Sequence, residues 1–240
     1  MRNLKEYYMK TIGLIGGMSW ESSLAYYRII NEQVKRRCGG LHSARSLMYS
    51  VDFAEIETLQ QQGRWDAAAM ILADAARRLE RGGADLLVVC TNTMHIVADA
   101  IADAVSIPLL HIADPTAEAV RAAGLRTVGL LGTRFTMEQA FYKGRLTEQH
   151  GLSVLVPEDT ERETIHRIIY EELCQGIIQP EARAAYLRIM ERLHAAGAEG
   201  IILGCTEIGL LIKAEDSRLP LFDTTRLHAE AAVAYALGLG

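Results

Sequence analysis

The sequence predicts an α/β protein of two pseudosymmetric lobes, each with a mostly parallel four-stranded sheet flanked by helices. Short runs rich in β-branched residues and leucine alternate with longer amphipathic stretches, which is typical of strands and crossover helices. Three segments also recur in the same order, at offsets of 116, 114 and 112 positions: 11–17 at 127–133, 83–91 at 197–205, and 107–110 at 219–222. These matches imply two similar half-chains, so we expect an active site in the cleft between the lobes.

The strand pattern occurs eight times, and helical periodicity separates most of its occurrences. We expect strands at 11–15, 47–51, 86–90, 108–112, 127–131, 153–156, 200–204 and 220–222. We expect helices at 22–35, 65–82, 93–105, 115–123, 137–149, 161–176, 180–196 and 226–237.

The boundary between the lobes is expected at the helix end marked by Gly124, because no linker rich in proline, glycine or serine separates the halves. One lobe then comprises 9–123 together with 224–240, whose last helix folds back, and the other comprises 124–223. Residues 1–8 precede the first apolar strand, and we expect them to form a flexible extension.

Composition and charge exclude several classes of function. The 240-residue chain is 50% hydrophobic and 23% charged, and its net charge of −5 is spread without acidic or basic blocks. This pattern argues against nucleic acid or a membrane surface as a partner. No apolar run approaches the roughly 20 residues of a membrane span, and the N-terminus lacks the apolar core of a secretory signal. We expect a cytoplasmic protein with a small-molecule substrate; a homodimer is one assembly left open.

The sequence offers no motif for a metal or cofactor. Its cysteines (Cys38, Cys90, Cys174 and Cys205) form no Cys-x-x-Cys pair, and its seven histidines are scattered. None of its five lysines stands in a motif suited to a Schiff base with pyridoxal phosphate (PLP). The segment 13–17 lacks the spacing of a dinucleotide or phosphate loop, so it predicts a tight strand-to-helix turn.

Two equivalent strand ends are the candidate catalytic positions. Cys205 follows a strand and precedes an expected helix, and the repeat puts Thr91 in the same setting. A lone buried cysteine is usually a small hydrophobe, but a helix N-terminus can hold a carboxylate and lower a thiol pKa. Thr91 is a far weaker base, and it could instead cap a helix or bind substrate. Because strand side chains alternate, Cys90 is expected to point into the core.

Other polar residues near the strand ends are candidates for binding substrate. They are Met18, Gln60, Asn92, Thr93, Gly132, Thr133, Thr136, Thr206 and Glu207, with His166 and Cys174 as secondary candidates. Glu207 and Asp114 could orient groups or act as acids, and both could equally be helix caps.

Together these residues resemble the PLP-independent aspartate/glutamate racemase family over residues 10–238. The resemblance rests on four motifs: Ile12-Gly-Leu-Ile-Gly-Gly-Met18, Asn92-Thr93 before His95, Gly132-Thr133-x-x-Thr136 and Gly204-Cys205-Thr206-Glu207. The resemblance implies two pseudosymmetric α/β lobes, each of which supplies one catalytic cysteine, and no cofactor.

The chain departs from that family's pattern at three places. Thr91 replaces the first cysteine, which is similar to an enterobacterial branch with a Thr/Cys pair and implies action mainly on L-aspartate or L-glutamate, or a wider specificity. Cys174 stands where several aspartate racemases have a lysine, and no arginine follows the second strand around 50–53. These losses make a strictly acidic substrate less expected and leave room for neutral amino acids such as homoserine.

The resulting prediction is a cofactor-independent amino-acid racemase. Cys205 would remove the α-proton from one face, and Thr91, or a water that it binds, would serve the other. Asn92, Thr93 and Thr206 would contact the substrate carboxylate. Two alternatives stay open: a decarboxylase or cis–trans isomerase of the same superfamily with a single active cysteine, and a non-catalytic amino-acid-binding protein.

Overall fold

The computed structural model describes residues 9–239, and the expected extension 1–8 lies outside them. The chain forms two compact units. Unit 1 comprises residues up to Cys90, Val97–Leu110 and the residues from His228 onward, and unit 2 comprises Thr91–Ile96 and His111–Leu227.

Unit 1 contains a parallel sheet with the strand order β2-β1-β3-β4. The strands are β1 (Ile12–Gly16), β2 (Ser46–Ser50), β3 (Leu86–Val89) and β4 (Leu109–Leu110). Every residue of β1 and β3 is buried, as expected for central strands of a parallel sheet that is covered on both faces.

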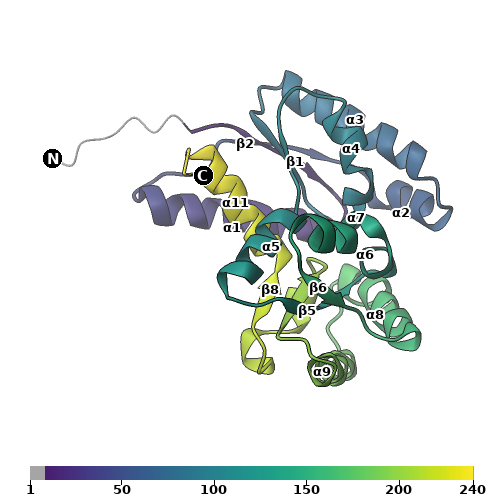
Figure 1. Cartoon of the computed structure of the whole chain (residues 1–240). Helices are drawn as coiled ribbons and strands as arrows, with labels where there is room; N and C mark the ends of the chain where they lie inside the picture. Colours follow the sequence, from purple (N-terminus) through teal and green to yellow (C-terminus); the bar gives the residue numbers. More distant parts are fainter. Residues whose placement is uncertain (1–8, 240) are drawn as a thin grey trace. The chain divides into compact units, whose positions relative to one another are not determined.

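Helices cover both faces of the sheet in unit 1. Ile12 and Leu14 pack with residues of α1 (Trp20–Cys38) and α11 (Thr224–Ala236), whereas α3 (Trp65–Arg81) and α4 (Ala98–Ala102) lie on the other side (Figure 1). The Ser19 side chain caps α1 by accepting from the Ser22 N–H at 3.2 Å. A further helix, α2 (Phe53–Gln61), follows β2.

Unit 2 repeats the arrangement with the order β6-β5-β7-β8. Its strands are β5 (Thr127–Gly132), β6 (Ser153–Leu155), β7 (Gly200–Gly204) and β8 (Leu221–Asp223). Helices α5 (Ala113–Ala122) and α9 (Pro180–Ala195) lie on opposite sides of it (Figure 1). The helix packs closely at Gly129, because a Cβ there would lie 2.9 Å from Leu193 Cδ1 of α9.

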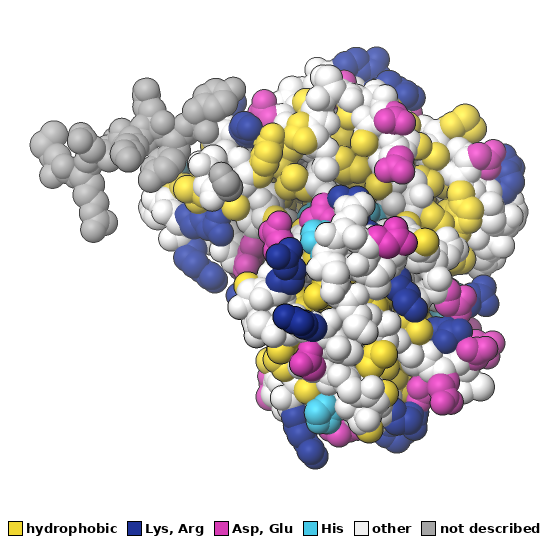
Figure 2. Space-filling model, in the orientation of Figure 1, with side chains coloured by type: hydrophobic (Ala, Val, Ile, Leu, Met, Phe, Trp, Pro, Cys, Tyr) yellow, Lys and Arg dark blue, Asp and Glu magenta, His cyan; other side chains and the backbone are white. Residues whose placement is uncertain are grey.

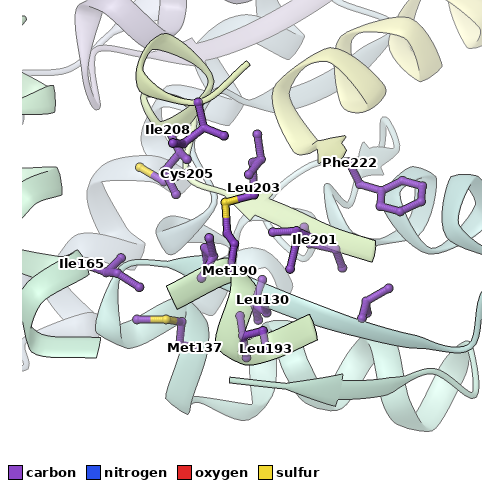
Figure 3. Packing of buried hydrophobic residues seen from close by; sticks show 14 of the residues in the cluster. Leu130, Met137, Ile165, Met190, Leu193, Ile201, Leu203, Cys205, Ile208 and Phe222 are labelled. Atoms are coloured by element: carbon purple, nitrogen blue, oxygen red, sulfur yellow. The ribbon is translucent and has the colours of Figure 1, made fainter. Parts of the chain in front are cut away.

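The core of unit 2 joins β5 and β7 to the helices α8 (Asp159–Glu171) and α9. Leu130, Ile201, Met190 and Leu193 belong to this core, and Figure 3 shows Cys205 beside Ile208 at one edge of it. Apolar side chains thus surround β7 up to its end, and the candidate cysteine is the next residue.

All eight predicted strands are present, within one or two residues at each end, and the predicted fold class is confirmed. The helices differ more. The expected helix 93–105 is a 3₁₀ turn η1 (Thr93–Val97) followed by the five-residue α4. The expected helix 137–149 is divided into α6 (Arg134–Glu138), α7 (Ala140–Gly144) and the π turn η2 (Arg145–Gln149).

Four short elements were not predicted as separate pieces. They are α2, α10 (Ile208–Leu211) and the 3₁₀ turns η3 (Leu173–Gln175) and η4 (Ala214–Asp216). The last three have only three or four residues, too few for a periodic signal to develop in the sequence, whereas α2 has nine.

The division into units differs from the predicted lobes at three places. The main part of unit 2 begins at His111 and ends at Leu227, and unit 2 also includes Thr91–Ile96, which lies between parts of unit 1 along the chain. The repeat places this segment at the end of a strand of unit 1, but its hydrogen-bond partners lie in unit 2, as described below.

No helix among residues 9–239 is long and apolar enough to cross a membrane. Basic and acidic side chains are interspersed on the surface drawn in Figure 2.

Candidate active site

The site is built at the carboxyl ends of β5 and β7. Gly132 and Gly204 are register partners at the ends of these strands, so Thr133 and Cys205 follow at the same level of the sheet. A Cβ on Gly132 would lie 2.7 Å from the Gly204 carbonyl oxygen, which is backbone and cannot move aside. Glycine therefore brings the two strand ends close together at the edge where open α/β sheets bind ligands.

The segment 91–96 is bound to these strand ends by side-chain hydrogen bonds. Asn92 Nδ2 donates to Thr224 Oγ1 at 3.0 Å, and Thr224 Oγ1 donates to the Leu203 carbonyl at 2.8 Å. Thr93 Oγ1 shares a hydrogen bond of 2.9 Å with Thr133 Oγ1. These contacts place Thr91 in the same unit as Cys205.

The buried ring of His95 fixes the backbone of Thr91. His95 Nε2 accepts from the Ile112 backbone N–H at 3.2 Å, so this nitrogen carries no proton. The proton must then lie on Nδ1, which is 2.9 Å from the Thr91 carbonyl oxygen and donates to it. His95 is thereby a neutral residue with one tautomer, and it positions Thr91.

Cys205 is hydrogen-bonded to a carboxylate. Its Sγ–H donates to Glu207 Oε2 at 2.9 Å, and Thr206 Oγ1 donates to the same oxygen at 2.5 Å. Cys205 is 9% exposed and Glu207 is 3% exposed, so the pair is largely shielded from water. Glu207 thus acts on the thiol directly, a role that the sequence left open between orienting, acid catalysis and helix capping.

The pKa of Cys205 is raised, although a helix N-terminus could have lowered it. Burial raises the pKa of this thiol well above its ordinary value, and the negative charge of Glu207 adds to the rise. The helix in question is α10, which has only four residues and begins three positions after Cys205. In this state the cysteine is a thiol whose proton points at a carboxylate.

Three of the candidate threonines form a cluster. Thr133 caps α6, because its Oγ1 accepts from the Thr136 N–H at 3.3 Å and lies 3.2 Å from Thr136 Oγ1. Together with Thr93 this makes a buried group of three hydroxyls beside the end of β5.

His166 contacts the two residues that directly follow Thr133. Its Nδ1 accepts from the Arg134 backbone N–H at 3.3 Å, and its ring packs against Phe135. Burial lowers the pKa of His166, and the Arg134 guanidinium lowers it further. Half-buried Cys174, in η3, packs against the core cluster that contains Cys205.

Three candidates remain. Met18 and Gln60 are buried side chains of unit 1. Asp114 forms a two-point ion pair with Arg145 at 2.6 and 2.8 Å and contacts His150 at 3.0 Å, so it joins α5 to η2 rather than serving Cys205.

Sequence reasoning missed Thr224 and the role of His95. The available signal was that Thr224 directly follows β8, the strand next to β7, so it marks a third strand end at the same edge of the sheet. Within the described part of the chain, no group of three histidine, cysteine or carboxylate side chains is arranged to hold a metal ion.

Comparison with known proteins finds relatives along most of the chain. A sequence model of the Asp/Glu/hydantoin racemase family matches residues 15–232. The broad specificity amino-acid racemase RacX of Bacillus subtilis (strain 168) is 26% identical over 172 residues, which cover 70% of this chain and 72% of RacX.

Two solved structures match more completely. A candidate Asp/Glu racemase from Yersinia pestis is 59% identical with a TM-score of 0.89, and the match covers 95% of this chain and 100% of that one. An aspartate racemase homologue from Pyrococcus horikoshii OT3 is 38% identical with a TM-score of 0.81, covering 95% and 99%. The predicted family resemblance and the predicted isomerase class are confirmed.

The raised pKa of Cys205 predicts slow alkylation. Below the pH of about 8.5 at which an unperturbed cysteine ionises, the thiol should react slowly with iodoacetamide, because little thiolate is present. Its rate should rise only at higher pH. Glu207→Gln removes the negative charge and should move the rise to lower pH, making alkylation severalfold faster at pH 8. Peptide-resolved mass spectrometry measures the rate at Cys205.

Glu215→Gln is the matched control, because Glu215 is exposed and its change should leave the profile unmoved. A profile that is the same in Glu207→Gln and wild type would show that the carboxylate does not hold the thiol proton.

Proposed function

The chain belongs to the Asp/Glu/hydantoin racemase family, and on this premise we propose that it inverts the α-carbon of amino acids without a bound cofactor. The observation that carries the proposal is the Cys205–Glu207 hydrogen bond at the end of β7. The thiolate, not the thiol, is the base that can remove the α-proton of an amino acid. Glu207 lies where it can accept the proton that the thiol must lose.

Glu207 gives the thiol a route to ionise. In the resting state the thiol keeps its proton, since burial and the adjacent carboxylate both raise its pKa. Transfer of that proton to Glu207 Oε2, 2.9 Å away, produces the thiolate without bringing water into the site. The thiolate then takes the α-proton from one face of the substrate, and Thr206 keeps the carboxylate oriented through its 2.5 Å bond.

Thr91 serves the opposite face in this proposal, through its hydroxyl or a water bound to it. The segment that carries it is held by Thr133, Thr224 and the ring of His95, so its position is well defined. A threonine hydroxyl is a far weaker acid than a thiol, so it cannot supply a comparable base. Proton removal from the face of Thr91 should therefore be the slower half of the reaction.

The proposed substrates are L-aspartate and L-glutamate, with a wider range that includes neutral polar amino acids. The solved relatives are described as an Asp/Glu racemase candidate and an aspartate racemase homologue, and the curated relative as a broad specificity amino-acid racemase. Cys174 stands where several aspartate racemases have a lysine, and Glu172 beside it pairs with Arg167 at 3.3 Å. We therefore propose that the pocket for the substrate side chain is less cationic than in a dedicated aspartate racemase.

The first test is Cys205→Ala. Loss of the base should reduce exchange of the α-proton with solvent deuterium by about a hundredfold or more for both enantiomers, with the circular dichroism spectrum unchanged. The assay is mass-spectrometric deuterium uptake by L- and D-aspartate. The equivalent change Cys90→Ala is the control, because Cys90 is fully buried in the core of unit 1 and should not affect exchange beyond its effect on stability.

Full exchange in a folded Cys205→Ala protein would overturn the mechanism. Release of carbon dioxide in place of deuterium uptake would instead identify the single-cysteine decarboxylase, and binding with neither signal would identify a non-catalytic binding protein.

Thr91→Cys should accelerate the slow half of the reaction. A second thiol provides a base that can ionise on that face, so initial deuterium uptake from the slower enantiomer should rise severalfold, while the faster enantiomer changes little. Thr91→Ser, which keeps a hydroxyl, is the matched control. Equal uptake from both enantiomers in wild type, unaltered by Thr91→Cys, would show that position 91 does not limit the rate.

A substrate panel checks the specificity. We expect measurable racemisation of L-homoserine alongside L-aspartate and L-glutamate, because a less cationic pocket penalises a neutral side chain less. Chiral chromatography after incubation of each amino acid measures the products. Strict action on dicarboxylic amino acids would require a cation from elsewhere, and loss of activity in Arg134→Gln, Lys143→Gln or Arg45→Gln would locate it.

A further inference from the structure

The imidazole of His166 is a hydrogen-bond acceptor for the backbone directly after Thr133. The Arg134 N–H donates to His166 Nδ1 at 3.3 Å, and a backbone amide can only donate, so Nδ1 carries no proton. A protonated imidazole has a proton on both nitrogens and offers no acceptor. Turning the ring over would bring the Cδ2 carbon to the place of Nδ1, and this carbon accepts no hydrogen bond. Protonation of His166 and the bond from Arg134 therefore exclude each other.

This bond completes the start of α6, which lies beside α8, the helix that carries His166 (Figure 1). The first N–H groups of a helix have no acceptor within it. Thr133 Oγ1 supplies an acceptor for the Thr136 N–H, and His166 supplies one for Arg134, the first residue of α6. The imidazole thus fixes the backbone next to Thr133 from a neighbouring helix.

Thr133 connects the start of α6 to the segment that carries Thr91. Its Oγ1 shares a hydrogen bond of 2.9 Å with Thr93 Oγ1, two residues after Thr91. Both hydroxyls belong to buried side chains, so losing this bond would leave buried polar groups without a partner. A change at His166 therefore reaches Thr91 through hydrogen bonds, whereas Cys205 is bonded within the segment that follows β7.

The charges around the ring favour its neutral form. Burial lowers the pKa of His166, and the Arg134 guanidinium lowers it further, against the opposite effect of the Glu138 carboxylate on α6. Glu138 is itself paired with Arg162 of α8 at 2.9 Å. On α8 the ring also lies against Tyr170, with 4.7 Å between the ring centroids.

Three further elements contact α8: β5, which has no ionisable residue, η3, whose Cys174 is half-buried, and α9. From α9, Arg192 pairs with Glu161, and on α8 itself Arg167 pairs with Glu172 at 3.3 Å. These charges are thus engaged with one another. The imidazole is accordingly neutral near neutral pH and gains its proton in acid, below the ordinary histidine pKa of about 6.5.

We propose that His166 is a positioning residue for proton removal on the face of Thr91. Its neutral ring fixes the start of α6 and, through Thr133 and Thr93, the segment of Thr91, and a protonated ring no longer does so. The inference rests on the proposed function and adds a regulation of the same site by pH. The contribution of the neutral ring is fully present above about pH 6.5. It is lost as the pH falls through the lowered pKa of His166.

The test measures deuterium uptake from each enantiomer of aspartate between about pH 5 and pH 8. The readout is the ratio of the slower to the faster rate, because a general loss of folded protein lowers both rates equally. In wild type this ratio should be constant above about pH 6.5 and fall about tenfold in acid, the effect of one lost hydrogen bond.

Two substitutions of His166 should fix the ratio at either limit. His166→Asn presents an amide oxygen at the place of Nδ1 and does not titrate, so its ratio should keep the neutral value in acid. This variant retains Cys205 and Glu207, so their own ionisation acts equally on it and on wild type. His166→Phe keeps an aromatic ring without an acceptor, and its ratio should be low at every pH. His150→Gln is the matched control, because His150 contacts Asp114 at 3.0 Å instead, and its profile should match wild type.

A wild-type ratio that does not change with pH would overturn the proposal, as would a fall in His166→Asn equal to that in wild type. An equal loss of both rates in folded His166→Phe would also overturn it, because the ring would then only stabilise the fold. If wild type exchanges neither enantiomer at pH 8, the racemase proposal fails, and nuclear magnetic resonance still tests the bond. The Arg134 amide proton should shift on acidification in wild type but not in His166→Asn, and the absence of any shift in wild type would overturn the bond's dependence on pH.

Discussion

The hydrogen bond from Asn92 to Thr224 is the contact on which the candidate site depends. The segment 91–96 leaves a strand of unit 1 with buried polar side chains, and buried polar groups must find partners. Unit 2 supplies them: Thr224 for Asn92, Thr133 for Thr93 and the Ile112 N–H for His95. These bonds bring the second candidate catalytic residue, Thr91, into the unit that contains Cys205.

The same segment shows how a fixed tautomer can set backbone geometry. The His95 ring lies between a donor at Ile112 and an acceptor at Thr91, so neither nitrogen is available for proton transfer. The ring packs edge-on against His111, with 4.7 Å between the ring centroids. A histidine in a site sequence is often taken as an acid or base, but here its two bonds make it a structural link between η1 and the start of α5.

The sequence predicted the eight strands and the candidate residues, because both follow from short, local signals. Apolar runs bounded by turns locate strands, and the internal repeat pairs Thr91 with Cys205. The pKa of Cys205 could not be predicted, since it depends on the side-chain conformation of Glu207 and on burial by residues distant in the sequence. The 3₁₀ turn at the start of the expected helix 93–105 was not predicted for a similar reason. Tertiary hydrogen bonds of Asn92, Thr93 and His95 favour this turn over the helix that the periodicity indicated.

The grouping of 91–96 with unit 2 has a consequence for how the protein can be divided. The chain passes from one unit to the other four times, so neither unit is a continuous stretch of sequence. A fragment that comprises only 111–227 would carry Cys205, Glu207 and Thr133 but would lack the partners that Thr133 and Thr224 find in 93 and 92. The repeat points to duplication of a half-chain. Each unit nevertheless contains separate stretches of the sequence, so an excised half would not reproduce this site.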